Sequence, residues 1–307
     1  MLDVRRMRVL REVALRGSIA GAAEALSFTP SAVSQQVAKL EREAGVPLVQ
    51  RGPRSIRLTE AGHALVAHAE AILERLAEAE SELRELAGRE PVLRVGSITT
   101  AAVTLLPAAL ARFARVRPET EVTVVEADPL AGLSRLRERE YDLALVFEYD
   151  YVQLPADERL TYEVLLEEEL RAVLPVGHPS ARQRAVRLLD LADATWIRST
   201  PRSSCHPFTE RACRAAGFEP RFGLEVDDYT AMQNLVAAGA GVAMAPDLGL
   251  TRRNPGVAVR PIAFGAPRRR VLAAYRAGEA TLPAVAAMLE ALHAAVADRE
   301  AALAEVS

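Results

Sequence analysis

The 307-residue sequence contains only two cysteines, Cys205 and Cys213, and a single lysine, Lys39. Two cysteines cannot build a disulfide framework, so a reducing compartment is expected. No run of about 18 apolar residues occurs, which argues against a membrane-spanning helix. The charged first residues also lack the apolar core of a signal peptide. We therefore expect a cytoplasmic protein with no membrane partner.

Net charge is also small, at −3, and a near-neutral chain taken as a whole argues against nucleic-acid binding. The total conceals an asymmetry, however. In roughly the first 58 residues Arg and Lys outnumber Asp and Glu by about two to one, whereas the stretch from Glu60 to Glu90 is acidic. A basic module on a neutral chain is typical of a multidomain regulator.

Three short helical patterns occupy this basic segment. Apolar residues on one face indicate helices over 4–16 and 18–26, and Thr29 can cap a third helix over 30–44. The following residues, LVQRGPRSIRLT, predict two short strands around a turn. Two helices joined by a tight turn place the second across the DNA major groove. On spacing alone, a three-helix packing module with polar surface residues remains the alternative.

The clearest periodicity follows this segment. Apolar residues recur at steps of four and three for about three heptads: Leu65, Ala69, Ile72, Leu76, Ala79, Leu83 and Leu86. An amphipathic helix packed on its own domain would also have one apolar face, and that alternative stays open. The strict heptad spacing favours a helix that pairs with a second copy.

From Val92 onward, short apolar runs alternate with helical patterns. This alternation predicts an α/β domain with parallel sheets, long enough for two lobes. Helices are expected near 100–116, 129–139, 205–216, 228–238 and 281–305. Strands are expected at 92–97, 121–127, 142–147, 169–175, 195–198, 222–227, 241–246 and 270–276.

Enzyme signatures are weak. The sequence Gly239-Ala240-Gly241 follows a helical pattern rather than a strand, which is the wrong context for a dinucleotide loop. The histidines show no metal-ligand spacing. Ser204, Cys205 and His206 are chain neighbours, which does not make a nucleophile–base pair. We expect neither catalysis nor a metal site.

An ordered series of residues between Ser18 and Gly62 closely resembles the DNA-binding domain of LysR-type transcriptional regulators. The matching positions are Ser18, Ala22-Ala23-x-x-Leu26, Pro30-Ser31-Ala32-Val33-Ser34, Leu40-Glu41, Gly45-x-x-Leu48, Arg51 and Leu58-Thr59-x-Ala61-Gly62. Such a series is far more specific than one short motif. One departure is Val49, where the family usually has Phe, and a smaller apolar side chain should fill that core site less completely.

The resemblance implies three parts: a winged helix-turn-helix domain over 1–58, a dimerisation linker helix over 59–90 and an effector-binding domain over 91–307. The implied fold class is an all-α winged helix-turn-helix, a long coiled-coil linker helix and an α/β, two-lobed, periplasmic-binding-protein-like domain. Lobe 1 would hold about 92–166 and 268–300, and lobe 2 about 167–267. A solute-binding protein of this fold would need an export signal and no DNA-binding head.

The resemblance also assigns DNA-binding residues. Glutamine can pair with adenine edges and serine with several bases, while arginine suits phosphates or the minor groove. The implied partner is double-stranded DNA with a pseudo-palindromic operator, bound by a dimer that assembles further into a tetramer. Nucleoid association, and RNA polymerase as a partner of an activator, would follow. Carried over by position, the candidates are Ser18, Ser31, Ala32, Ser34, Gln35, Lys39, Arg51, Arg54 and Arg57.

Polar or aromatic residues at strand ends are the candidates for effector binding, because ligand clefts of α/β domains open there. Helix capping is the alternative role for several of them. The resemblance implies a small-molecule inducer between the lobes and no cofactor. A constitutive DNA-binding protein with an assembly domain is the remaining hypothesis. The candidates are Ser97, Thr99, Thr100, Phe147, Ser199, Thr200, Arg202, Asp227, Asp228 and Tyr229.

The two cysteines lie in the second lobe, where peroxide-sensing members of the resembled family use two cysteines. Cys213 falls within the helical pattern ERACRAAGF, whose apolar face would bury it. A free cysteine is often a small buried hydrophobic residue. We therefore favour a structural role over redox sensing.

Overall fold

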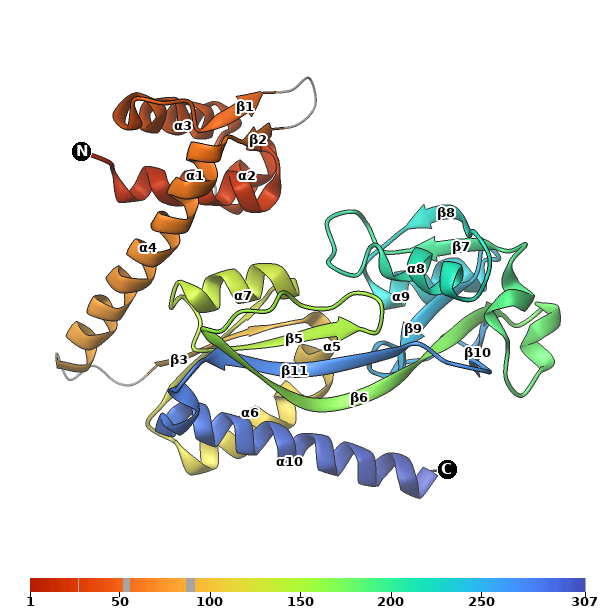
Figure 1. Ribbon diagram of the computed structural model, residues 1–307. Coiled ribbons are helices and arrows are strands. Elements are labelled where there is room, and N and C mark those ends of the chain that lie inside the picture. Colours follow the sequence, from red (N-terminus) through yellow and green to blue (C-terminus); the bar gives the residue numbers. More distant parts are fainter. Residues whose placement is uncertain (27, 52–55, 87–91, 307) are drawn as a thin grey trace. The chain divides into compact units, whose positions relative to one another are not determined.

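A computed structural model describes residues 1–26, 28–51, 56–86 and 92–306. The chain divides into two compact units (Figure 1). One consists of Met1–Arg89 with Arg137–Glu140, and the other of Glu90–Leu136 with Tyr141–Ser307.

The N-terminal unit begins with a three-helix head and a β-hairpin. Its elements are α1 (Val4–Arg16), α2 (Ile19–Ala25), α3 (Pro30–Ala44), β1 (Val49–Arg51) and β2 (Ile56–Leu58). The caps follow from the sequence: the Thr29 hydroxyl accepts the Ala32 N–H at the start of α3, and Gly45 ends that helix at φ 72°. The left-handed conformation at Gly45 costs a glycine little. Both expected wing strands are confirmed and pair antiparallel.

Apolar side chains from the three helices and the hairpin form the core of this head. Leu10, Val33, Val37 and Leu40 are fully buried. Val49 is 8% exposed in the same cluster, so it occupies the core position expected for it.

The linker helix α4 (Glu60–Leu86) continues from the head (Figure 1). Its first turns pack on the head through Leu65 and the fully buried Ala69. Beyond Ala69 the apolar face is uncovered within the described chain, since Ile72 is 41% and Leu76 47% exposed. The side chains of Leu83 and Leu86 lie outside the described residues.

The second unit contains a seven-stranded sheet in the order β10-β6-β11-β5-β3-β4, with β9 also paired to β6. The long strand β6 passes from lobe 1 into lobe 2, where β9 and β10 pair with it, whereas β11 pairs with β5 and with the first part of β6 (Figure 1). A two-stranded sheet, β7 (Thr195–Arg198) with β8 (Arg221–Glu225), completes lobe 2. The sheet strands are β3 (Val92–Ser97), β4 (Glu121–Glu126), β5 (Leu143–Tyr149), β6 (Leu160–Pro175), β9 (Ala243–Pro246), β10 (Val257–Pro261) and β11 (Arg268–Arg276).

The expectation of parallel sheets is correct for only part of this unit. Strand β3 is parallel to β4 and β5, and β7 is parallel to β8. All pairs made by β6 and β11 are antiparallel. Strand β6 is also much longer than expected, because Glu163 and Glu167–Glu169 interrupt its apolar pattern. Strand β10 was not predicted.

Helices cover the sheets as the periodicity indicated, with one difference. The pattern at 100–116 forms two helices because Pro107 begins a new one within the first turn of α6. The helices are α5 (Thr99–Thr104), α6 (Leu106–Val116), α7 (Pro129–Arg137), α8 (Phe208–Ala215), α9 (Tyr229–Ala237) and α10 (Pro283–Val306). Short 3-10 turns occupy η1 (Pro179–Arg182), η2 (Leu188–Leu191), η3 (Asp247–Leu250) and η4 (Glu279–Thr281).

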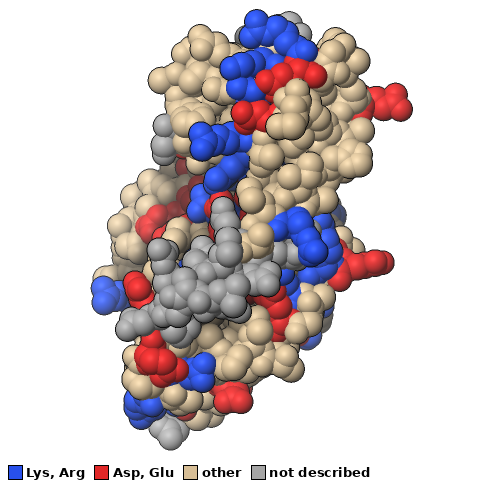
Figure 2. Space-filling view, turned by 90° about the vertical axis from the view of Figure 1, so that its left-hand side faces the viewer, with Lys and Arg blue, Asp and Glu red and all other residues tan. Residues whose placement is uncertain are grey.

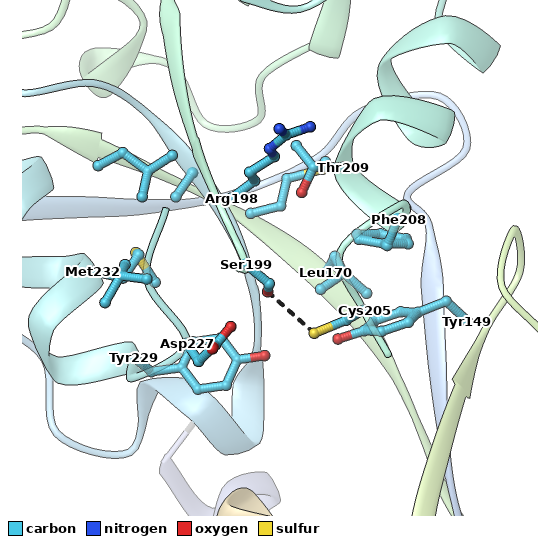
Figure 3. Close-up of a pocket in the computed structure, with 14 residues that line it drawn as sticks. Tyr149, Leu170, Arg198, Ser199, Cys205, Phe208, Thr209, Asp227, Tyr229 and Met232 are labelled. Atoms are coloured by element: carbon cyan, nitrogen blue, oxygen red, sulfur yellow. Dashed lines mark hydrogen bonds between the residues drawn. The ribbon is translucent and has the colours of Figure 1, made fainter. Parts of the chain in front are cut away.

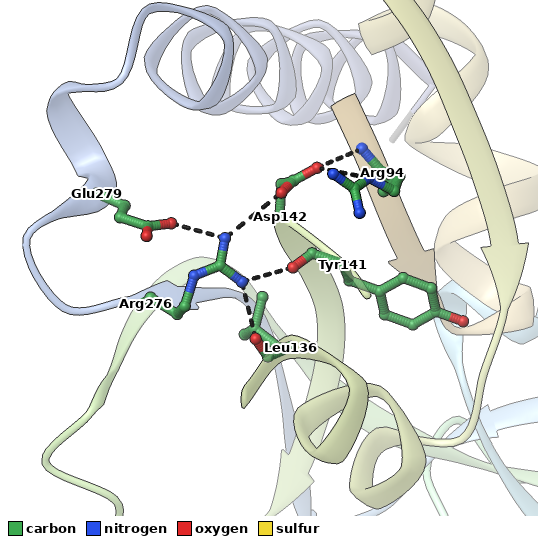
Figure 4. Close-up of polar contacts among 6 residues, drawn as sticks. All are labelled: Arg94, Leu136, Tyr141, Asp142, Arg276 and Glu279. Carbon is green, nitrogen blue, oxygen red and sulfur yellow. Dashed lines mark hydrogen bonds and ion pairs between the residues drawn. The ribbon is translucent and has the colours of Figure 1, made fainter. Parts of the chain in front are cut away.

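Arg276 anchors one end of lobe 1 (Figure 4). Its guanidinium donates to the carbonyl oxygens of Leu136 (2.8 Å) and Tyr141 (2.6 Å). It also pairs with Asp142 (3.4 Å) and Glu279 (2.7 Å). The Leu136 carbonyl lies in the last turn of α7, where helix carbonyls lack intrahelical partners. One buried arginine therefore joins the end of α7 to β5 and β11.

Candidate DNA interface and effector cleft

The recognition helix α3 separates its buried and exposed residues cleanly. Its buried face is apolar, whereas Ser31, Gln35, Lys39 and Arg42 are exposed at steps of four, four and three. Residues at these steps lie along one face of a helix. Ala32 and Ser34 are half-buried beside that stripe.

Two cations on this stripe have no described partner. Neither Lys39 nor Arg42 makes an ion pair within the described residues, whereas Arg6 on α1 is engaged by Gln36 (3.2 Å) and Glu43. Arg42 was missed by sequence reasoning, although its step of three from Lys39 was the available signal. On the face shown in Figure 2, the N-terminal unit at the top displays Lys and Arg side chains with Asp and Glu among them.

Other DNA-binding candidates differ in position. The Ser18 hydroxyl accepts the Gly21 N–H at 3.0 Å and so caps α2. Arg57 is exposed on β2 opposite Gln50. Arg51 lies in β1, but its side chain, like the whole of Arg54, is outside the described residues.

The three polar lobe 1 candidates for effector binding are already hydrogen-bonded to the protein's own groups. The Ser97 side chain is fully buried and donates to the Ile98 carbonyl at 3.1 Å. Thr99 donates to Glu126 (2.5 Å), and Thr100 accepts a hydrogen bond from Arg269 (3.3 Å). In this conformation none of these three lines the pocket described next.

A pocket in the second unit lies at the carboxyl end of β7 (Figure 3). It brings together three of the predicted residues, Ser199, Asp227 and Tyr229, from two segments of lobe 2. Its enclosed volume is about 30 Å³, which suffices for water rather than a metabolite. Side chains not predicted from sequence also line it: Tyr149, Leu170, Ile197, Arg198, Cys205, Phe208, Thr209, Val226, Met232, Ala243 and Met244.

Thr200, Asp228 and Phe147 adjoin residues that line this pocket without lining it themselves. Thr200 donates its N–H (2.9 Å) and hydroxyl (2.6 Å) to Asp227. Asp228 caps α9 by accepting the Ala231 N–H at 2.7 Å. Arg202 is exposed, and Phe147 packs edge-on against Tyr149 with ring centroids 5.3 Å apart.

Two tyrosine hydroxyls and one thiol that line the pocket are neutral. Burial raises the pKa of Tyr149 well above its ordinary value and raises the pKa of Tyr229 to about 12. Burial also raises the pKa of the Cys205 thiol, although its hydrogen bonds with Ser199 and Ser203 oppose that shift. Protonated hydroxyls and a thiol can donate and accept hydrogen bonds but carry no charge.

A direct contact joins the lobes beside this pocket. Asp128, at the start of α7 in lobe 1, accepts the N–H of Ser204 (2.8 Å) and also its hydroxyl. Ser204 belongs to the segment between β7 and α8 in lobe 2. Nothing in the sequence around Asp128 distinguished it from an ordinary helix cap, a role that it also has through the Leu130 N–H (3.2 Å).

The two thiols should react slowly with disulfide reagents in the folded protein. Cys213 is fully buried, as the helical pattern predicted, and burial raises its pKa to about 12. At pH 8 such a thiol is ionised in about one molecule in ten thousand, and only the thiolate reacts. We expect dithionitrobenzoate to label both cysteines slowly at pH 8, and both rapidly in guanidinium. Fast labelling of Cys213 in folded protein would contradict this prediction.

The described residues show no helix long and apolar enough to cross a membrane. Nor do they contain a group of three or more His, Cys, Asp or Glu side chains that could hold a metal ion.

Comparisons with known proteins agree with this architecture. Residues 4–63 match the family described as bacterial regulatory helix-turn-helix protein, lysR family, and residues 86–297 match the LysR substrate binding domain. The transcriptional dual regulator GltC of Bacillus subtilis is 29% identical over 88% of this chain and 89% of its own length.

Solved structures share the fold along nearly the whole chain. The OxyR C206 mutant of Corynebacterium glutamicum has a TM-score of 0.61 at 24% identity, covering 100% of this chain and 95% of its own. Full-length CbnR in complex with its target DNA has a TM-score of 0.56 at 22% identity, covering 96% of this chain and 100% of its own.

Proposed function

This chain belongs to the LysR family of transcriptional regulators, and from that premise we propose how it recognises DNA and responds to an effector. The observation that carries the proposal is the exposed stripe of α3, with two hydrogen-bonding side chains followed by two cations that make no ion pair with any described residue. Such a helix can enter a major groove, read base edges through Ser31, Ser34 and Gln35, and hold phosphates through Lys39 and Arg42. The exposed Arg57 of the wing would add a further phosphate or minor-groove contact.

Substitutions on α3 should separate these two roles. We expect Ser34→Ala or Gln35→Ala to reduce the difference in binding free energy between the selected and the scrambled duplex by about 1–3 kcal/mol. Lys39→Ala and Arg42→Ala should weaken binding to all sequences and each lower the salt slope by about one. Anisotropy titrations against a duplex selected by the full-length protein from a random pool, and against a scrambled duplex, measure both effects.

The matched control for the phosphate contacts is Arg115→Ala, because Arg115 is also exposed in the last turn of a helix, on α6 of lobe 1. It should leave affinity and salt slope unchanged. Unchanged selectivity in both the Ser34 and Gln35 variants would refute the assignment of α3.

We propose that α4 pairs with the same helix of a second copy, which presents two heads to a pseudo-palindromic operator. The exposed Ile72 and Leu76 support this pairing, since they continue the seam beyond the head. The double variant Ile72→Asp/Leu76→Asp should sediment as a monomer where the wild type is a dimer or larger. Glu60→Ala, on the exposed side of the first turn, is the control. An unchanged sedimentation coefficient of the double variant would exclude this interface.

We further propose that a small-molecule effector, with no other cofactor, binds between the lobes beside Ser199, Asp227 and Tyr229. Because the enclosed pocket is so small, the lobes must separate for a metabolite to enter, and the Asp128–Ser204 contact would have to open. A change in lobe arrangement would then alter the paired heads through α4, coupling effector and DNA affinity.

Thermal shift of the full chain against carboxylic and amino acids tests this coupling. A stabilising compound should also change DNA affinity, footprint or bending. A compound that binds without any of these effects would favour a constitutive regulator instead. We also propose that the dimers assemble into a tetramer and that the protein acts on the nucleoid in the cytoplasm. If it activates transcription, it would contact RNA polymerase.

A further inference from the structure

Glu41, on the last turns of the recognition helix, holds the base of the wing. Its carboxylate oxygen Oε1 accepts the N–H of Leu48 at 2.8 Å and the N–H of Val49 at 3.1 Å. One side chain thereby satisfies two successive backbone donors at the start of β1. Hydrogen bonds from backbone N–H groups to an ionised carboxylate are stronger than neutral ones.

The same short segment is held from its other side by the start of the linker helix. The Thr59 hydroxyl donates to the Pro47 carbonyl (2.8 Å), and the Thr59 N–H donates to the Leu48 carbonyl (3.0 Å). Residues 47–49 are thus fixed between α3 and α4. Among the described residues of this segment, Leu48 is almost fully buried.

The position of this segment determines where Arg57, a wing cation among the described residues, lies. Val49 pairs with Leu58, and the next residue, Gln50, pairs with Arg57 across the hairpin. A shift of β1 relative to α3 would therefore move Arg57 relative to Lys39. Protein–DNA contacts depend on such relative placement, because phosphates are spaced regularly along the groove.

We propose that Glu41 is a positioning residue for DNA binding, which sets the wing and its Arg57 in register with the recognition helix without touching DNA. Because Glu41 acts through the wing, removing its side chain should weaken DNA binding only in proteins that retain Arg57. A merely structural role would weaken binding equally in every background.

A double-mutant cycle on the full chain distinguishes the two. The probe is the duplex selected from a random pool by the wild-type protein. We expect Glu41→Ala to weaken binding about tenfold in the wild type and in Lys39→Ala, but less than about threefold in Arg57→Ala. Equal loss in the Arg57 and Lys39 backgrounds, or no loss in the wild type, would overturn the proposal.

Two further variants keep the test decisive. Glu41→Gln retains an oxygen acceptor at the same reach and should bind DNA as the wild type does, with amide exchange at Leu48 and Val49 still slow. A loss as large as that of Glu41→Ala would show that the acceptor is not what matters. If circular dichroism shows that Glu41→Ala unfolds the head, the cycle is measured with Glu41→Asp, whose shorter side chain cannot keep both bonds.

Discussion

Replacing Gly62 by alanine is expected to weaken specific DNA binding about a hundredfold while the effector domain stays folded. A Cβ atom at this position would lie 2.1 Å from the carbonyl oxygen of Leu48. That carbonyl cannot easily move, because it accepts the Thr59 N–H and its residue is held by Glu41. Moving the new Cβ atom and the Leu48 carbonyl apart should cost about 3 kcal/mol. If this cost destabilises the DNA-binding conformation of the head, DNA affinity falls about a hundredfold.

Anisotropy with the selected duplex measures this loss, and differential scanning calorimetry shows whether the effector domain still melts as before. Gly177→Ala is the matched control, because a Cβ there would meet no atom within 4 Å. Wild-type DNA affinity of the Gly62 variant would mean that the junction of wing and linker is far more plastic than its contacts indicate.

Removing the Arg269 guanidinium is expected to destabilise the effector domain by about 3–5 kcal/mol, because it leaves a buried carboxylate without its partner. Arg269 is 1% exposed and donates to Glu168 at 2.8 and 2.5 Å. It also reaches Thr100 of α5 at 3.3 Å, while Glu168 accepts the Leu248 N–H of η3 at 2.8 Å. The pair therefore connects one lobe to the other through the central strands.

Urea unfolding of Arg269→Met measures this destabilisation. The double variant Arg269→Met/Glu168→Gln should recover a large part of the loss, because the buried charge is gone while an acceptor for Leu248 remains. Arg112→Met, which breaks the more exposed pair with Asp298, is the control and should change stability by less than about 1 kcal/mol. If Arg269→Met is as stable to urea as Arg112→Met, the Arg269–Glu168 pair contributes little to stability.

Most of the head could be predicted because its signals are local. Thr29, Pro30 and Gly45 determine the ends of α3 through capping and backbone conformation, which depend on neighbouring residues alone. The exposed stripe follows from the helical period once those ends are known. Only Arg42 was overlooked, although the same period includes it.

The pocket in lobe 2 was harder to predict because its residues come from distant segments. Ser199, Asp227 and Tyr229, which the strand ends singled out, line one pocket, and their role in effector binding stays a prediction. Tyr149, Cys205 and Phe208 line it as well, yet they carry no marker that separates them from core residues. The sequence also did not indicate that β6 and β11 pair antiparallel with their neighbours, since an apolar run is compatible with either parallel or antiparallel pairing.

The sequence by itself determined the family, the caps of the recognition helix and the heptad face of α4, because each depends on residues close together in the chain. Only the tertiary structure decided which residues from distant segments contact one another. It placed Glu41 against the N–H groups of Leu48 and Val49, and Asp128 of one lobe against Ser204 of the other. Such contacts depend on how whole elements pack, and an acidic side chain looks the same in the sequence whether it caps a helix or joins two lobes.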